Sequence, residues 1–122
     1  CVVPRAKVNY RPNQLLFKAA VKQTLSSLFG VEDGSDYIIR TVDTRTTHRD
    51  RHGYGGNGKM PYPGITLDSC TISDNVRGRE IILIDDLYTK TVNIDEDAIE
   101  ALLKKGAKSV TFYSIGRTVS RF

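Results

Sequence analysis

The sequence has no tryptophan, one methionine and two cysteines among 122 residues, and aromatic residues make up only 8%. Two cysteines, Cys1 and Cys70, are too few for a disulfide scaffold, so we expect a reducing compartment. No basic-then-apolar leader opens the sequence, which also favours the cytoplasm. A membrane span would need about 20 consecutive apolar residues, and the longest apolar run is only Ile81–Ile84. We therefore expect no membrane span.

Charge of either sign is also modest. The chain carries 18 Lys and Arg against 14 Asp and Glu, a net charge of +4, with 39% apolar and 26% charged residues. This composition is typical of a globular domain and excludes disordered, collagen-like and coiled-coil chains. The length fits one domain, since single cores usually organise about 100–150 residues. The small positive surplus permits an anionic partner without favouring nucleic acid over a phosphorylated small molecule.

The chain opens without methionine on Cys1-Val2-Val3-Pro4, which is typical of the end of a buried strand. We therefore expect residues 1–122 to form a single domain that lacks its N-terminal part. Pro4 turns the chain into the basic loop Arg5-Ala6-Lys7. A helix is predicted from Pro12 to about Phe29, because its apolar residues share one face: Leu15, Leu16, Ala19, Ala20, Leu25 and Leu28.

The rest of the chain alternates strands with helical or loop segments. We predict strands at Tyr37–Val42, Arg79–Ile84 and Ser109–Ile115, and a capped helix from Ile94 to Lys105. The four aliphatic residues ending the second strand predict burial on both faces, as in parallel sheets. The polar, glycine-rich segment 43–64 predicts a long flexible loop that could cover a site. The fold class is therefore α/β, with a parallel-sheet core flanked by helices.

The segment with the clearest chemistry follows the most apolar strand. Ile81–Ile84 is followed by Asp85 and Asp86, and a hydroxyl-rich loop then leads into the predicted helix. In open α/β sheets ligands bind beyond the carboxyl ends of the strands, and helix N-termini favour anions. Adjacent carboxylates beside a phosphate site either accept hydrogen bonds from sugar hydroxyls or help to hold hydrated Mg²⁺. These residues predict a phosphorylated sugar as ligand.

The same segment resembles the type I phosphoribosyltransferases, particularly their competence-protein (ComF-like) branch. The family signature is an aliphatic run, two acids, two variable residues and Thr-Thr-Gly-x-Thr before a helix. Here Ile81–Ile84, Asp85, Asp86, Leu87-Tyr88 and Thr89 match its beginning.

The similarity also touches other parts of the chain. It continues through residues 101–110 into Ile115-Gly116-Arg117-Thr118, and upstream Val3-Pro4-Arg5 and Arg11-Pro12-Asn13-Gln14 resemble elements of that branch. The match is dense only over residues 79–115.

The resemblance implies a phosphoribosyltransferase-type fold that binds phosphoribosyl pyrophosphate (PRPP) with Mg²⁺, transfers the phosphoribosyl group to an unidentified acceptor and releases pyrophosphate. Asp85 and Asp86 would hold the ribose hydroxyls and, through ribose or water, the metal. The residues implied to bind the 5′-phosphate are Thr89, Lys90, Thr91, Val92 and Asn93, and those implied to face the pyrophosphate are Arg5, Ala6 and Lys7.

Two departures affect the phosphate loop. Thr91 stands where the family has glycine, and Asn93 where it has threonine. Glycine lets backbone N–H groups approach a phosphate and adopts positive φ at little cost, whereas a β-branched residue is restricted. A non-catalytic module that senses PRPP or a nucleotide is therefore one alternative, and a basic DNA-interacting protein is another. The oligomeric state is left open, with a homodimer as one possibility.

Other motif matches fail on their context. Residues 53–59 satisfy G-x-x-x-x-G-K, but the preceding residues are too polar for a buried strand and Met60 replaces the required Ser or Thr. A receiver domain carries its paired acids near its start, whereas only 36 residues follow Asp86 here. His48 and His52 have the spacing of a helical metal pair, but their surroundings are not helical. We predict solvated loop histidines.

Overall fold

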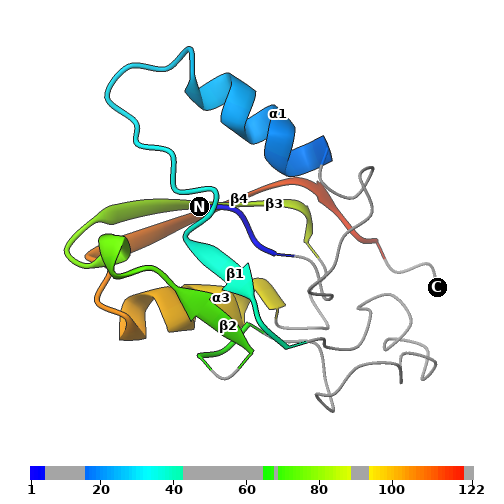
Figure 1. Ribbon diagram of the computed structural model, residues 1–122. Coiled ribbons are helices and arrows are strands. Elements are labelled where there is room, and N and C mark those ends of the chain that lie inside the picture. The colour runs from blue at the N-terminus through cyan, green and yellow to red at the C-terminus, as the bar shows by residue number, and fades with distance from the viewer. Residues whose placement is uncertain (5–15, 43–64, 68, 89–93, 120–122) are drawn as a thin grey trace.

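The computed structural model describes residues 1–4, 16–42, 65–67, 69–88 and 94–119. Figure 1 shows the elements along the chain. They are α1 (Leu16–Leu25), β1 (Ile38–Arg40), β2 (Cys70–Ile72), the 3-10 turn η2 (Asp74–Val76), β3 (Glu80–Tyr88), α3 (Ile94–Lys104) and β4 (Ser109–Arg117). The described part is a small α/β structure, as the alternation of elements in the sequence predicts. The loop expected over 43–64 lies outside the described residues.

Strand β3 is central among three parallel segments. It pairs in parallel with β4, from Glu80 opposite Ser109 to Tyr88 opposite Arg117. On its other side the chain start runs parallel to it, with Val2 opposite Ile84. The backbone N–H of Val3 donates to the carbonyl of Ile84 at 3.0 Å, and the N–H of Ile84 donates to the carbonyl of Cys1 at 2.9 Å. The predicted parallel arrangement is confirmed, and so is the strand-like start of the chain.

Helix α3 connects the two long strands and packs beneath them. Its buried side chains include Ala98, Ala101 and Leu102, which join the core around Leu83. Gly106 follows the end of the helix, and its φ is +108°. There the N–H of Gly106 donates to the carbonyl of Leu103 at 3.0 Å, and the N–H of Ala107 donates to that of Leu102 at 3.1 Å. A glycine in this conformation satisfies the last carbonyls, so the predicted end of the helix is confirmed within one residue.

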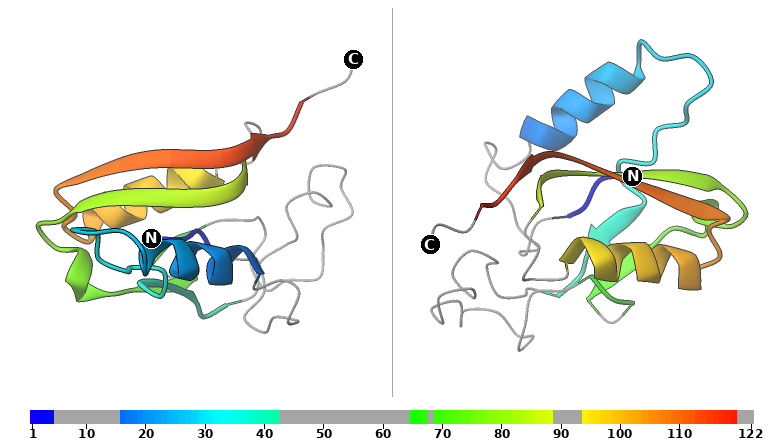
Figure 2. Two further views of the ribbon diagram at one scale, coloured as in Figure 1. Left: turned by 90° about the horizontal axis from the view of Figure 1, so that it is seen from above. Right: turned by 180° about the vertical axis from the view of Figure 1, so that it is seen from behind.

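The predicted burial of β3 on both faces is wrong for the described part of the chain. Ile81 and Leu83 are buried on the α3 side, but the side chain of Ile82 between them is 52% exposed. Neighbouring β4 alternates in the same way between half-buried and exposed residues. A run of aliphatic residues predicts a strand buried on both faces only if other elements cover both faces of the sheet. Here α3 covers the face on which Ile81 and Leu83 lie. Figure 2 shows α3 on one side of β3 and β4.

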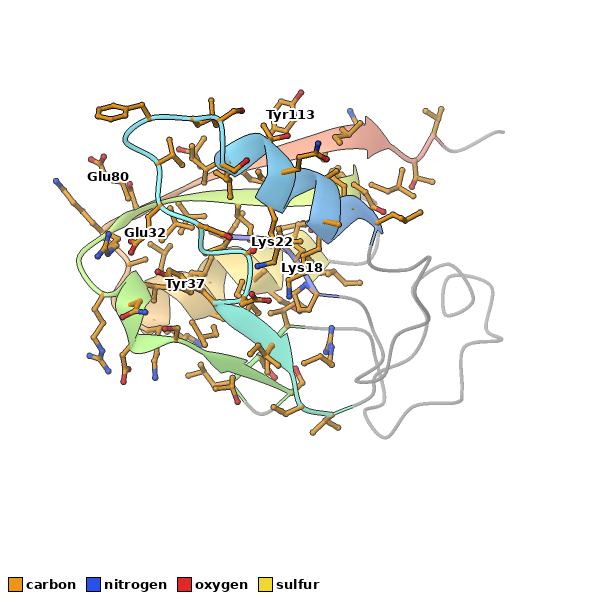
Figure 3. All side chains as sticks on the ribbon, turned by 45° about the horizontal axis from the view of Figure 1, so that its top comes forward. Lys18, Lys22, Glu32, Tyr37, Glu80 and Tyr113 are labelled. Carbon is orange, nitrogen blue, oxygen red and sulfur yellow. The ribbon has the colours of Figure 1, made fainter. Side chains whose placement is uncertain are left out.

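Helix α1 lies on the opposite side of the sheet from α3, displaced toward residues 1–4 (Figures 1 and 2). None of its residues is buried, so the predicted apolar face is largely exposed. The helix ends at Leu25 rather than at Phe29, because the hydroxyls of Ser26 and Ser27 donate to the carbonyls of the preceding turn at 2.6 and 2.8 Å. Lys18 and Lys22, labelled in Figure 3, both pair with Asp36.

A second, antiparallel sheet joins β1 to β2, with Ile38 opposite Ile72 and Arg40 opposite Cys70. The strand predicted at Tyr37–Val42 is thus present in a shorter form. Cys70 is buried and its thiol is free. None of the helices in the described ranges is long and apolar enough to cross a membrane.

Candidate functional site

The candidate site lies where β3 ends and α3 begins. Asp85 and Asp86 occupy the carboxyl-terminal half of β3, and Asp95 lies in the first turn of α3. Asp85 is opposite Ser114 of β4, and its Oδ1 accepts a hydrogen bond from the backbone N–H of Asp86 at 2.8 Å. The central strand therefore delivers both predicted acids to the edge of the sheet where α/β proteins commonly bind ligands.

The structure adds a third acid that faces the first two. Asp95 is only 3% exposed, and its Oδ1 has no hydrogen-bond partner among the described residues. Its carboxyl group lies beside that of Asp85, and each shifts the pKa of the other. Two neighbouring ionised carboxylates repel each other, so this arrangement favours a proton on one of the two. Asp85, Asp86 and Asp95 form what we call the acidic cluster.

The proton of the acidic cluster belongs on Asp85. Burial, followed by the neighbouring carboxyl groups of Asp95 and Asp86, raises the pKa of Asp85 to about 9. Burial also raises the pKa of Asp95, but there the hydrogen bond from Asp85 acts in the opposite direction. Asp85 is thus the donor and Asp95 the acceptor at neutral pH.

The remaining acids of the first turn of α3 do not join this cluster through any described hydrogen bond. Glu96 accepts a hydrogen bond from the hydroxyl of Tyr88 at 3.5 Å, and the ring of Tyr88 packs on Phe112 with centroids 5.8 Å apart. Burial, followed by repulsion from Glu100 and Glu96, raises the pKa of Asp97. The start of α3 thus carries one inward-facing acid, Asp95, beside others on its surface.

Sequence reasoning missed Asp95. Its position in the first turn of a helix is explained by the helix dipole alone, and acids there are common. The sequence offered one signal: an apolar strand that ends in two acids is followed by a helix that begins with three acids. Only the placement of α3 beneath β3 shows which of those three faces inward.

Several predicted site residues lie outside the described residues. They are the residues expected to bind the 5′-phosphate (Thr89, Lys90, Thr91, Val92 and Asn93) and those expected to face the pyrophosphate (Arg5, Ala6 and Lys7). Of the predicted site, the structure therefore places Asp85 and Asp86 and brings them together.

The carboxyl groups of the site are the next question for a divalent metal. No group of three or more His, Cys, Asp or Glu side chains within the described ranges is arranged to hold a metal ion. Mg²⁺ commonly binds through one or two carboxylates, several waters and the phosphates of a substrate. Asp85 and Asp86 supply carboxyl oxygens of that kind.

Comparison with models of protein families found no match, and neither did the searches of curated proteins and of solved structures.

Proposed function

We propose that this domain binds PRPP with Mg²⁺ at the carboxyl end of β3 and acts as a phosphoribosyltransferase. The observation that carries the proposal is the pair Asp85 and Asp86 at the end of the central parallel strand, just before the N-terminus of α3. Carboxyl oxygens accept hydrogen bonds from ribose hydroxyls, and a helix N-terminus favours a phosphate. The ligand that meets both demands is a phosphorylated sugar.

The acidic cluster supports a ribose rather than a bare anion as the group beside β3. Three carboxyl groups would repel a free phosphate or a nucleic-acid backbone placed directly against them. Hydroxyl groups are donors and are attracted to the same oxygens. The phosphate groups of the ligand would lie beyond the cluster, toward the residues that precede α3, and Mg²⁺ would arrive bound to the diphosphate.

In the proposed reaction an acceptor displaces pyrophosphate from the anomeric carbon of PRPP. The bond from that carbon to the pyrophosphate oxygen breaks, its electron pair leaves with pyrophosphate, and the acceptor forms the new bond. Such a reaction needs positioning and stabilisation of the leaving group rather than a protein nucleophile. Asp85 and Asp86 would hold the ribose through its hydroxyls while the bond changes take place.

Calorimetric titration with PRPP and Mg²⁺, followed by an assay for released pyrophosphate, tests the proposal. We expect the wild type to bind, and Asp86→Asn to weaken binding at least about tenfold, because hydrogen bonds to a charged group contribute about 1.5–3 kcal/mol. Glu100→Gln is the matched control, since Glu100 is an exposed acid of α3 that pairs only with Lys104 among the described residues. Equal affinities of the Asp86 variant and the control would contradict the proposed site.

A PRPP-sensing module is the second candidate, because Thr91 replaces the loop glycine of the resembled family. Binding without pyrophosphate release across a panel of bases would favour it over the enzyme. DNA binding that weakens steeply with salt, with no response to PRPP, would favour the third alternative, a DNA-interacting protein.

A further inference from the structure

Helix α1 contributes no side chain to the hydrophobic core. None of its ten residues is buried, and within the described ranges no α1 side chain packs against the buried core cluster. Phe17, Val21 and Leu25, which share one side of the helix, are only half-buried. Isolated helices shorter than about 12–15 residues are marginal in water. Helix α1 therefore depends on further contacts to remain folded and docked.

Two lysines of α1 supply such contacts. Lys18 and Lys22 are four residues apart and so lie on the same side of the helix, as Figure 3 shows. Asp36 pairs with both of them: its Oδ1 contacts the Nζ of Lys18, and its Oδ2 lies 2.7 Å from the Nζ of Lys22. The Oδ2 of Asp33 lies 3.6 Å from the Nζ of Lys22. Three ion pairs thus join two successive turns of α1 to one short segment of the chain.

That segment, residues 33–37, is fixed to the body of the molecule, and we call it the acidic turn. Gly34 and Ser35 are buried, and the N–H of Ser35 donates to the Oδ1 of Asp33 at 2.9 Å. The N–H of Tyr37 donates to the carbonyl of Gly34 at 2.9 Å, and the side chain of Tyr37 packs against the core. The acidic turn is therefore held in place by the body of the protein, and it offers α1 a fixed pair of carboxylates.

The ion pairs between α1 and the acidic turn are exposed to solvent. Their four side chains are between 27% and 58% exposed, and exposed ion pairs are individually weak and screened by salt. We propose that α1 is a conditional helix, which is folded and docked while Lys18 and Lys22 hold the acidic turn and is released when dissolved ions screen these pairs. Release leaves no described helix on the side of the sheet opposite α3 (Figure 2). The switch operates whether or not the domain binds PRPP.

Helix α3 is the contrasting case within the same molecule. It buries Ala98, Ala101 and Leu102 in the core. Its own exposed pair, between Glu100 and Lys104 at 3.2 Å, is therefore not what holds it. Ionic screening weakens ion pairs but not the burial of apolar side chains. Salt should loosen α1 while α3 stays docked, so α3 serves as an internal reference.

Hydrogen exchange of the full chain in about 0.1 M and 1 M sodium chloride tests the switch, because the Debye length falls from about 10 Å to about 3 Å between these conditions. The protection of the α1 amides, relative to those of α3, should decrease about threefold or more, as expected for the weakening of three exposed ion pairs. An α1 that is already unprotected in 0.1 M salt, or whose protection changes in parallel with that of α3, would overturn the proposal.

Variants of Asp36 separate the ion pairs from general effects of salt. Asp36→Asn removes the pairs with both lysines, so it should lower the protection of α1 about threefold in 0.1 M salt and reduce its response to 1 M salt. Asp36→Glu keeps the charge and should behave like the wild type. The matched control is Asp74→Asn, because Asp74 also contacts two basic side chains, Arg77 at 3.4 Å and Lys105 at 3.2 Å, neither of them in α1. Wild-type protection of α1 in Asp36→Asn, or an equal loss in Asp74→Asn, would refute the switch.

Discussion

Asp95→Asn changes the acidic cluster with little change in shape, and its effect follows from the proton held by Asp85. Burial, with the hydrogen bond to Asp95 second, raises the folded-state pKa of Asp85 to about 9, far above the roughly 3.9 of an unfolded aspartate. Between these values the folded state binds a proton that the unfolded state has released. Stability is therefore greatest below about pH 4 for this group and decreases as the pH rises toward 9.

The size of the effect follows from the linkage relation. One such proton lowers the free energy of unfolding by up to about 1.4 kcal/mol per pH unit, so about 2.7 kcal/mol is lost from pH 5 to pH 7. Asp95→Asn removes the acceptor carboxylate, and the new amide can donate to an ionised Asp85. The pKa of Asp85 should then be lower, and the loss of stability with pH should be shallower than in the wild type.

Urea unfolding at several pH values between 5 and 8 measures this slope. The exposed acids Asp36 and Asp74 do not contribute to the slope in this pH range. Hydrogen bonds to basic side chains lower their pKa below the usual value of 3.8. Groups common to both proteins, including the histidines, cancel in the difference between wild type and variant. Glu80→Gln should retain the wild-type slope, because Glu80 is an exposed acid that pairs with Lys108. Identical slopes for wild type and Asp95→Asn would refute the shared proton.

The remaining predictions concern the packing of α3 and the turn that ends it. Leu102 is fully buried whereas Leu103 is 47% exposed. Leu102→Ala should therefore lower the free energy of unfolding by about 2–5 kcal/mol, and Leu103→Ala should lower it by much less. Equal losses in urea unfolding would contradict the orientation of α3. Gly106 and Gly78 both have positive φ, but only at Gly106 would a Cβ meet a neighbour, the Cγ of Arg77 at 3.2 Å. Gly106→Ala should therefore lower the melting temperature more than Gly78→Ala, and the reverse order would contradict the turn geometry.

The unit from β3 to β4 could be predicted from the sequence because its signals are local. The aliphatic run, the acids in the first turn of α3 and Gly106 at its end each depend on a few neighbouring residues. Gly106 adopts positive φ as such an end requires, and the parallel pairing follows from a helix connecting two strands.

The features that could not be predicted depend on distant parts of the chain. The pairing of Ile38 with Ile72 joins strands far apart in sequence, and no local pattern specifies it. The exposure of Ile82 depends on whether a second layer covers the sheet, which an aliphatic run does not reveal. The contact between Asp85 and Asp95 requires the position of α3 beneath β3, so sequence spacing alone could not distinguish it from ordinary helix-dipole chemistry.

Calorimetric titration of PRPP and Mg²⁺ at neutral pH, in two buffers of different ionisation enthalpy, tests the central claim most directly. If ribose hydroxyls bind at Asp85 and Asp86, they favour the ionised form of Asp85, and binding should release protons. The measured heat should then differ between the buffers for the wild type and for Glu100→Gln, and Asp86→Asn should bind at least about tenfold more weakly. Absence of binding by the wild type, or undiminished binding by Asp86→Asn, would contradict the claim that this acidic cluster holds a phosphorylated ribose.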